Sequence, residues 1–508
     1  MHTDSNYLPA DDDMCNCFIS GENASKKDKA FQRALAVVNE QITLTRDQSG
    51  TCYATLTAGS GYETMPLDAP RLAREVKKIV RNGMKARPPK TLIAELVEEL
   101  VDDADSLAID DHAEANRRVA LGTQGQYFID LCNDDREVLI VNAKGYRLHT
   151  FTTEIPLFLR THGMMALPNP IGIMPNLNAL RGFLNVSSED SWRLLVVFLL
   201  FSVRPKGPYV ILILIGTAGS SKSTFSRTIR SLIDPSAAAT QTITKKPEDL
   251  IITATNSHLL VFDNVRELTF EISDMLCCLA TGASIRKRKL FTDSDETVLH
   301  AIKPCLLNGI SDIASQPDMV SRCIQLELPT IKVVRTEEEF HRSFEAARPA
   351  IFAGMMDALS KTMAALPNIT NVPRTRMADF AHFGMAVESA LGWEVGSFAT
   401  AYANNQREQM ANLMGDDPLA HAIRTLVQQD VEVGDPLSGT PTELLDALGE
   451  FPTHAQLTSA AWPKSPHSLS KRLKKMEPAL RACGVGIEFT HSGKRSITLS
   501  RLDGDSKA

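Results

Sequence analysis

The chain has 508 residues, of which 43% are hydrophobic and 23% are charged, with a formal net charge of −7. At about 100–200 residues per domain, this length predicts two to four domains. The balanced composition excludes a wholly disordered, collagen-like or low-complexity protein, and the acidic net charge excludes a uniformly basic DNA-coating protein.

The cysteines and the apolar runs indicate the compartment. Nine cysteines include no Cys-x-x-Cys pair, which argues against a zinc ribbon and favours a reducing environment. The longest apolar run, 194–201, is too short to span a bilayer, and the polar N-terminus does not resemble a signal peptide. We therefore expect a cytoplasmic protein with no membrane contact.

The first third of the chain predicts two small regions. Residues 1–120 form an α+β region, with a loose tail, a Thr-rich strand in TCYATLT, and helices in LAREVKKIV and TLIAELVEELV. The acidic stretch 91–116 is interpreted as a solvated helix face, with an acidic docking site as the alternative. Residues 121–189 form a mostly β segment (YFIDL, EVLIV, YRLHTF) that ends in the Pro-rich connector 166–176.

Residues 190–335 carry the pattern of an α/β domain. The helical run SWRLLVVFLLFSV leads to an apolar strand at 210–215, and further short apolar runs alternate with helical segments. This alternation predicts a mainly parallel sheet. Residues 336–415 are predicted to form a helical lid, and residues 416–508 a separate C-terminal domain.

A phosphate-binding loop follows the strand 210–215 and opens a helix, as a Walker A motif requires. Backbone N–H groups of such a loop surround phosphate oxygens, and the helix N-terminus adds positive potential. We expect Lys222 to reach the β- and γ-phosphates of ATP and Ser223 to bind Mg²⁺. Ser221 replaces the usual glycine, which requires a negative φ or tolerated strain; a chance Gly/Ser turn is the alternative. The predicted nucleotide-binding residues are Gly216, Thr217, Ala218, Gly219, Ser220, Ser221, Lys222, Ser223 and Thr224.

Asp263 ends the apolar run 259–262 and is the candidate Walker B carboxylate for Mg²⁺. Its separation from Lys222 predicts a strand next to the phosphate-loop strand. The following residue is Asn264, which can orient a water molecule but cannot accept its proton. Either Glu267 or Asp274 then acts as the base, or hydrolysis is slow.

Two further candidates for the nucleotide site lie downstream. Asn308 ends a third apolar run and can contact the γ-phosphate or the attacking water, although Asn-Gly is also a common turn. Arg322 can stabilise charge at a neighbouring subunit's nucleotide, and a surface salt bridge is the alternative.

A basic β-hairpin is predicted between these motifs, at 285–302. Four consecutive cations suit contact with DNA phosphates in a channel, whereas a solvated edge strand protected by Lys and Arg is the alternative. These residues are Arg286, Lys287, Arg288 and Lys289.

The C-terminal domain predicts helices followed by a two-stranded wing, the pattern of a winged helix. Residues 464–501 contain nine Lys or Arg against two Glu, a local excess typical of phosphate contact; a protein-binding domain is the alternative. Pro478 is predicted to kink or divide the last helix. The candidate DNA-binding residues are Lys471, Arg472, Lys474, Lys475, Lys494 and Arg495.

Several of these runs together resemble a known group of proteins. GTAGSSKST, SLIDPS, LLVFDNV, SDMLCCLATG, RKLFTDSDE, LLNGI, SRCIQLELP and the tail WPKSPHSLSKRLKKMEPALRACGVGIEF closely resemble bacterial ATP-binding proteins carried by phages, plasmids and integrative elements. The resemblance covers roughly 125–500, and the motor is similar in plan to superfamily 3 and MCM-like helicases of the AAA+ class. It implies a hexameric or other oligomeric ATPase, a pre-sensor hairpin at 285–303 in the pore, and Arg322 as an arginine finger in trans.

The sequence therefore predicts a DNA-dependent ATPase that uses ATP and Mg²⁺, as a ring-forming DNA helicase replicating a mobile element or phage. Its partners would be single-stranded DNA in the pore, duplex DNA at the winged helix, further copies of itself, and a primase or other replication protein. The alternative is a DNA-binding ATP switch, such as an initiator, a loader or a defence sensor, that hydrolyses slowly and does not translocate. A small-molecule phosphotransferase ranks third.

Overall fold

The computed structural model describes residues 26–502 except 59–60, 111–112, 151, 153–154, 245, 283–284, 289–295, 300, 311–312, 315, 332–334, 416, 432–434, 460, 483 and 491–495. Contacts divide the chain into two units, 1–116 with 150–160 and 117–149 with 161–508. The segment 150–160 thus belongs with the first unit, although the sequence grouped it with 121–189. Among the described residues, no helix combines the length and apolarity needed to cross a membrane.

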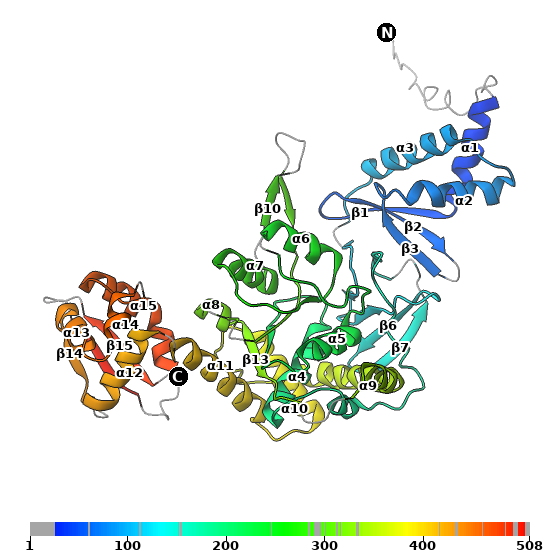
Figure 1. Cartoon of the computed structure of the whole chain (residues 1–508). Helices are drawn as coiled ribbons and strands as arrows, with labels where there is room; N and C mark the ends of the chain where they lie inside the picture. Colours follow the sequence, from blue (N-terminus) through cyan, green and yellow to red (C-terminus); the bar gives the residue numbers. More distant parts are fainter. Residues whose placement is uncertain are drawn as a thin grey trace, which may run out of the picture. The chain divides into compact units, whose positions relative to one another are not determined.

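The first unit is a small α+β domain (Figure 1). An antiparallel sheet of β1 (Ile42–Arg46), β2 (Cys52–Ala58) and β3 (Gly61–Pro66) packs with α1 (Lys26–Asn39), α2 (Leu72–Met84) and α3 (Lys90–Ser106). The predicted Thr-rich strand and both predicted helices are present. The buried side chains of α3 lie at Leu92, Leu96 and Leu100, so its acidic residues fall mainly on the outer face, as expected for a solvated helix.

The second unit begins with a four-stranded sheet of order β4-β5-β6-β7: β4 (Val119–Leu121), β5 (Tyr127–Asp130), β6 (Glu137–Asn142) and β7 (Gly145–Thr150). The three strands predicted from alternation are β5, β6 and β7. The connector follows without regular structure and leads through the 3₁₀ helix η1 (Leu177–Gly182) into α4 (Glu189–Ser202). Buried side chains of β5, β6 and α4 share one hydrophobic core.

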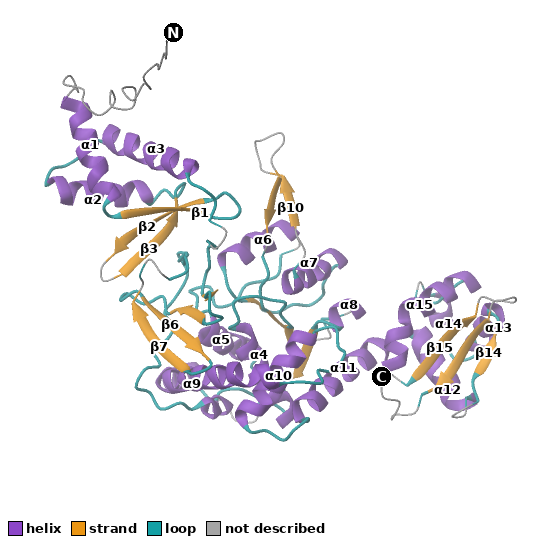
Figure 2. Cartoon of the chain, turned by 180° about the vertical axis from the view of Figure 1, so that it is seen from behind, coloured by secondary structure: helices purple, strands orange, loops and turns teal. Residues whose placement is uncertain are grey.

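The centre of the second unit is a parallel sheet of order β13-β8-β12-β9. Its strands are β8 (Ile211–Ile215), β9 (Leu260–Phe262), β12 (Cys305–Gly309) and β13 (Cys323–Glu327), and its connections contain α5 (Lys222–Ile233), α6 (Pro247–Asn256), α7 (Phe270–Thr281) and α8 (Pro317–Val320). Helices, drawn purple in Figure 2, lie around this part of the chain. Alternate residues of β8 enter two different cores. Burial on both faces explains why this strand is a continuous apolar run.

The strand order corrects one prediction. The Asp263 strand β9 is not the neighbour of β8, because β12 lies between them and pairs with both. Sequence separation does not determine adjacency in a parallel sheet, since each crossover can skip a position that a later strand fills. The consequence is that Asn308, on β12, lies between the phosphate-loop strand and the Asp263 strand.

The predicted hairpin is present in its backbone. β10 (Ile285–Arg288) pairs antiparallel with β11 (Glu296–Leu299), so that residue 285 faces 299 and residue 288 faces 296. The helical region that follows contains α9 (Glu337–Ala365), the 3₁₀ helix η2 (Leu366–Asn368), α10 (Ala378–Leu391) and α11 (Ser397–Gly415). Buried side chains of α9 and α10 complete the core that α4 begins.

α11 also covers the free edge of the parallel sheet. The side-chain amide of Asn405 accepts a hydrogen bond from the Gln325 N–H (3.0 Å) and donates one to the Gln325 carbonyl (2.6 Å). Gln406 and Gln409 donate to the carbonyl of Cys323. These amides replace the missing neighbour of edge strand β13 and block edge-to-edge pairing there.

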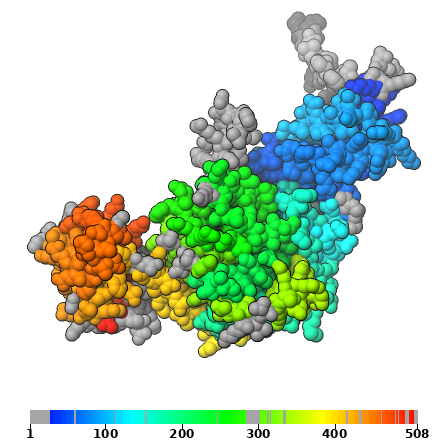
Figure 3. All heavy atoms as spheres, in the orientation of Figure 1, coloured from blue at the N-terminus to red at the C-terminus, as the bar shows by residue number. Residues whose placement is uncertain are grey.

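The C-terminal domain has its own core and forms a separate lobe in the space-filling view, coloured orange to red (Figure 3). It contains α12 (Pro418–Asp430), β14 (Leu437–Gly439), α13 (Pro441–Leu448), α14 (His454–Thr458), α15 (Pro466–Ala482), β15 (Val485–Thr490) and β16 (Ser496–Arg501), with strand order β14-β16-β15. The sequence predicted the hairpin but not β14. Of the two alternatives predicted for Pro478, division is wrong, because α15 is one helix from Pro466 to Ala482. Its buried residues on both sides of Pro478 belong to one core: Leu473, Met476, Ala479 and Leu480.

Candidate functional site

The predicted phosphate loop connects the buried strand β8 to the first turn of α5. The Lys222 ammonium donates to the carbonyls of Gly216 (2.6 Å) and Thr217 (2.9 Å), so it lies within the curve of the loop. The N-terminus of α5 opens directly after this curve, where free N–H groups and the helix dipole favour an anion. The local geometry therefore suits a phosphate group.

Ser221 adopts the left-handed conformation, with φ 59° and ψ 32°. The sequence allowed either a negative φ or tolerated strain, and the structure shows the second. A non-glycine residue in this region costs roughly 1–2 kcal/mol. Such strain persists only where surrounding contacts enforce it, and here the Ser221 carbonyl accepts the first helical bond from the Phe225 N–H (2.9 Å).

Ser223 and Asp263 are in contact, although they belong to different elements. The Ser223 hydroxyl donates to Oδ1 of Asp263 at 3.0 Å. Asp263 is held in turn by its own N–H, which donates to the Gln241 carbonyl (2.9 Å). A hydroxyl and a carboxylate side by side are oxygen ligands of the kind Mg²⁺ prefers. No described group of three or more His, Cys, Asp or Glu is arranged to hold a metal ion, so an ion here would take its other ligands from water and phosphate.

Asn308 connects the phosphate-loop helix to the Asp263 loop. Its amide nitrogen donates to Ser226 Oγ on α5 (2.7 Å), and its oxygen accepts the Asn264 N–H (3.0 Å). Asn308 is only 1% exposed, and Asn264 is held at φ 55°. Asn308 therefore positions two elements of the site; contact with a γ-phosphate or water stays a prediction.

A segment after β13 lies across the phosphate loop and was not predicted. Leu328 donates to the Ile215 carbonyl (2.8 Å), and the hydroxyls of Thr330 and Thr217 are 3.1 Å apart. The Asn185 amide donates to the Pro329 carbonyl and, at 3.5 Å, to the Ser220 carbonyl. Nothing local in the sequence distinguishes Asn185, because its partners lie far away along the chain.

The electrostatics of the loop also suit an anion. Burial lowers the pKa of Lys222, and the negative charge of Asp263 opposes that shift. A bound phosphate would add a second negative charge and favour the ammonium form further. The alternative bases Glu267 and Asp274 are both exposed.

Arg322 precedes β13 and is engaged within its own chain. It forms an ion pair with the Asp318 carboxylate and donates to the Asp318 carbonyl (3.0 Å), and it is 8% exposed. Arg322 thus forms an ion pair, as the alternative interpretation expected, but in a mostly buried position, and its contact with a neighbouring subunit's nucleotide stays a prediction.

The predicted DNA-binding residues fall into three groups. Arg286, Lys287 and Arg288 lie on β10, of which only the backbone is described, and Lys289, Lys494 and Arg495 lie outside the described residues. Lys471 is exposed on α15, and Lys474 lies over the Phe489 ring at 5.3 Å. Arg472 is paired with Asp417, a partner 55 residues away that could not be seen in the α15 pattern, and its contact with DNA stays a prediction.

These features define a mixed α/β protein with a four-stranded parallel sheet and a separate C-terminal domain. Comparison with family models then identifies its family. The model of the actinomycete integrative conjugative element replication protein matches residues 177–407, and the model of the AICE RepA C-terminal domain matches residues 419–507. Together they cover more than half of the chain, which therefore belongs to this family and is a replication protein of a mobile element. The residues matched by the two models include the phosphate loop, Asp263 and α15.

Other comparisons add little. A search of the curated proteins found no match. Among solved structures, "The A form apo structure of NrS-1 C terminal region-CTR" is 11% identical with a TM-score of 0.41, and "The A form apo structure of NrS-1 C terminal region-CTR(305-718)" is 10% identical with a TM-score of 0.40. Each alignment covers 93% of this chain and 99% of the other. At these values we draw no conclusion from the likeness.

Proposed function

We propose that this replication protein is a DNA-dependent ATPase that works as a ring-forming DNA helicase of the AAA+ class. The observation that carries the proposal is the 3.0 Å hydrogen bond between Ser223, at the start of α5, and Asp263, after β9. It brings together the two groups that a P-loop ATPase needs for Mg²⁺, beside a lysine that already lies within the loop.

The residues of the chain would divide the work as follows. Backbone N–H groups at the start of α5 would bind phosphate oxygens, and Lys222 would neutralise charge on the β- and γ-phosphates. Ser223 and Asp263 would hold Mg²⁺, which when bound would polarise the phosphate being transferred to water. Asn308 would keep the Asp263 loop and α5 in register through its two hydrogen bonds.

The C-terminal domain supports DNA binding as part of the same proposal. Its helices followed by a hairpin, with a third strand β14 joining the sheet, fit a winged helix. The domain carries the basic excess of 464–501, which would hold duplex DNA through its phosphates. The β10–β11 hairpin would contact single-stranded DNA in a ring.

The second candidate is an ATP switch without translocation, and one observation favours it. The residue after Asp263 is an amide, Asn264, which can orient a water molecule but cannot accept its proton, and the carboxylates of Glu267 and Asp274 are exposed. Slow hydrolysis would suit nucleotide-driven assembly on DNA rather than movement along it.

The test is ATP hydrolysis by the full chain, with and without single-stranded DNA. Lys222→Ala should abolish ATP binding and turnover, and Lys246→Ala, an exposed lysine before α6, should leave both unchanged. Strong stimulation by DNA supports the helicase and justifies strand-displacement assays. Slow turnover that DNA does not change favours the switch, and absence of ATP binding to the wild type refutes both.

A further inference from the structure

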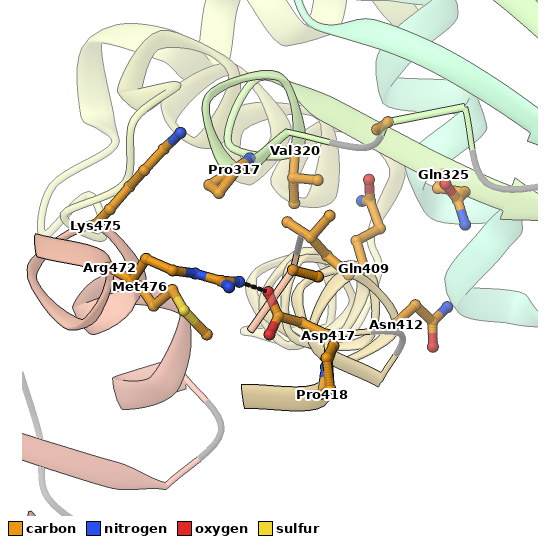
Figure 4. Close-up of a pocket in the computed structure, with 13 residues that line it drawn as sticks. Pro317, Val320, Gln325, Gln409, Asn412, Asp417, Pro418, Arg472, Lys475 and Met476 are labelled. Atoms are coloured by element: carbon orange, nitrogen blue, oxygen red, sulfur yellow. Dashed lines mark hydrogen bonds and ion pairs between the residues drawn. The ribbon is translucent and has the colours of Figure 1, made fainter. Parts of the chain in front are cut away.

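A cavity of about 500 Å³ lies where α8, α11 and α15 approach each other (Figure 4). Part of its lining is apolar, from Pro317, Val320 and Met476. The rest is polar: Arg472 extends from α15 toward Asp417, and Lys475 lines the edge of the cavity on the side of Pro317 (Figure 4). A cavity of this size and mixed lining is typical of sites for small organic groups.

The charged side of the cavity is held by one carboxylate. Oδ2 of Asp417 pairs with the Arg472 guanidinium, and the two side chains are only 23% and 28% exposed. Oδ1 of Asp417 accepts the N–H groups of Leu419 (2.9 Å) and Ala420 (3.2 Å), which caps α12. Asp417 therefore acts both as a helix cap, which needs only an oxygen acceptor, and as an ion-pair partner, which needs the charge.

The opposite side of the cavity contains an unsatisfied acceptor. Gln409 is 4% exposed, and its amide nitrogen donates to Asn405 Oδ1 at 2.8 Å. Its Oε1 is buried and has no hydrogen-bond partner among the described residues. A buried acceptor of this kind is stabilised by a ligand that brings an N–H or O–H group.

We propose that this cavity binds one nucleotide unit of a DNA strand. Its phosphate would bind Arg472 and Lys475, and an N–H of its base would donate to Gln409 Oε1. A guanidinium binds phosphate and carboxylate with the same fork geometry, so the Asp417 carboxylate occupies the phosphate's place in the free protein and DNA must displace it. The inference rests on the proposal that the C-terminal domain binds DNA.

The two faces of α15 then differ in role. Lys471 and Lys474 do not line the cavity, whereas Arg472 and Lys475 do. A free mononucleotide offers the same phosphate and base as a nucleotide unit of a DNA strand, so the experiment tests both ligands.

The experiment measures binding of a dye-labelled single-stranded oligonucleotide to the full chain by fluorescence anisotropy. Asp417→Asn removes the charge and keeps the cap, because Asn caps helices as well as Asp does. We expect it to tighten binding on the order of fivefold, since a partly exposed ion pair no longer competes. The matched control is Asp446→Asn on α13, an exposed position outside the cavity with the same change in net charge.

Each outcome decides the inference. The inference is supported if Asp417→Asn raises the affinity for the oligonucleotide more than Asp446→Asn does, and if this gain disappears in the Asp417→Asn, Lys475→Gln double variant. If the wild type binds DNA and the two Asn variants change its affinity equally, the cavity site alone is overturned. Failure of every variant to bind the oligonucleotide overturns the cavity site, and failure to bind a labelled duplex as well overturns the proposed DNA binding of the C-terminal domain. Binding of AMP but not of the oligonucleotide to Asp417→Asn in a Lys222→Ala background refutes the DNA strand and assigns the site to free nucleotides.

Discussion

Arg118 is a fully buried cation at the C-terminal end of the phosphate-loop helix α5. It is 0% exposed, and its guanidinium donates to Asp234 Oδ1 at 3.0 Å and to the carbonyls of Asp130 (3.0 Å), Met165 (3.0 Å) and Pro235 (3.2 Å). Asp234 ends α5 and is 2% exposed. Arg118 thus joins the β4–β7 sheet to the C-terminal end of α5.

We expect Arg118→Met to destabilise the second unit by about 3 kcal/mol. Removing one partner of a buried ion pair costs about 3–5 kcal/mol, and the lower end applies because Asp234 keeps the N–H groups of His258 (2.9 Å) and Leu259 (3.2 Å) and the Arg230 guanidinium at 3.9 Å. Burial raises the pKa of Asp234, but Arg118 and Arg230 bring it below its ordinary value. In the variant this pKa should therefore rise.

The assay is native-state hydrogen exchange, read by mass spectrometry on peptides from β8 and α5. It reports the opening free energy of this core without treating a chain of several domains as two-state. The control is Arg227→Met on α5, which removes a pair with Glu337 whose side chains are 48% and 85% exposed and should cost less than about 0.5 kcal/mol. If the opening free energies of Arg118→Met and of this control differ by less than about 1 kcal/mol, the buried ion pair does not stabilise this core and the reasoning is wrong.

Three further predictions concern other polar side chains. Burial lowers the pKa of His258 to about 4, whereas the pKa of an unfolded histidine is about 6.5. The unfolded chain therefore binds more protons between these two pH values, and the stability of the fold should fall as the pH drops from about 6.5 to 4. In thermal melts, His258→Gln should flatten this pH dependence, and the exposed control His467→Gln should not. Asn308→Leu should lower turnover on the order of tenfold with little change in ATP affinity, because it frees the Asp263 loop from α5; equal loss of affinity would contradict this positioning role. Asn405→Leu should promote aggregation in light scattering by uncovering the backbone of Gln325, and an unchanged aggregated fraction would refute the capping role.

The sequence predicted those parts of the site whose chemistry and local structure are contiguous. The phosphate loop needs a strand, a Gly/Ser turn, a lysine and a helix within one short segment, and all of them are visible in 210–224. Asp263 was recognisable because a charged residue directly follows a buried strand. Its contact with Ser223 could not be predicted, because that contact depends on two crossovers and on which strand fills the position between β8 and β9.

Long-range partners explain the remaining differences. The contacts of Asn185, the pairing of Arg472 with Asp417 and the amide cap on β13 each join segments more than 30 residues apart. A helix pattern shows that Arg472 is on a polar face but not what that face meets. β14 has three residues, too few for a period-2 pattern to be recognised.

α11 provides a direct physical link between the sheet and the proposed DNA site. Its amides hold the backbone of β13 at residues 323 and 325, directly after Arg322, and it ends at Gly415, two residues before Asp417. A shift of β13 on ATP binding would therefore reach the Asp417–Arg472 pair through one helix, because helices move as rigid elements whereas loops absorb displacement. If the link operates, ATP should change the DNA affinity of the wild type but not that of Asp417→Asn, in which the pair is already broken. An equal response of both proteins to ATP would mean that the nucleotide acts on DNA by another route, such as ring assembly.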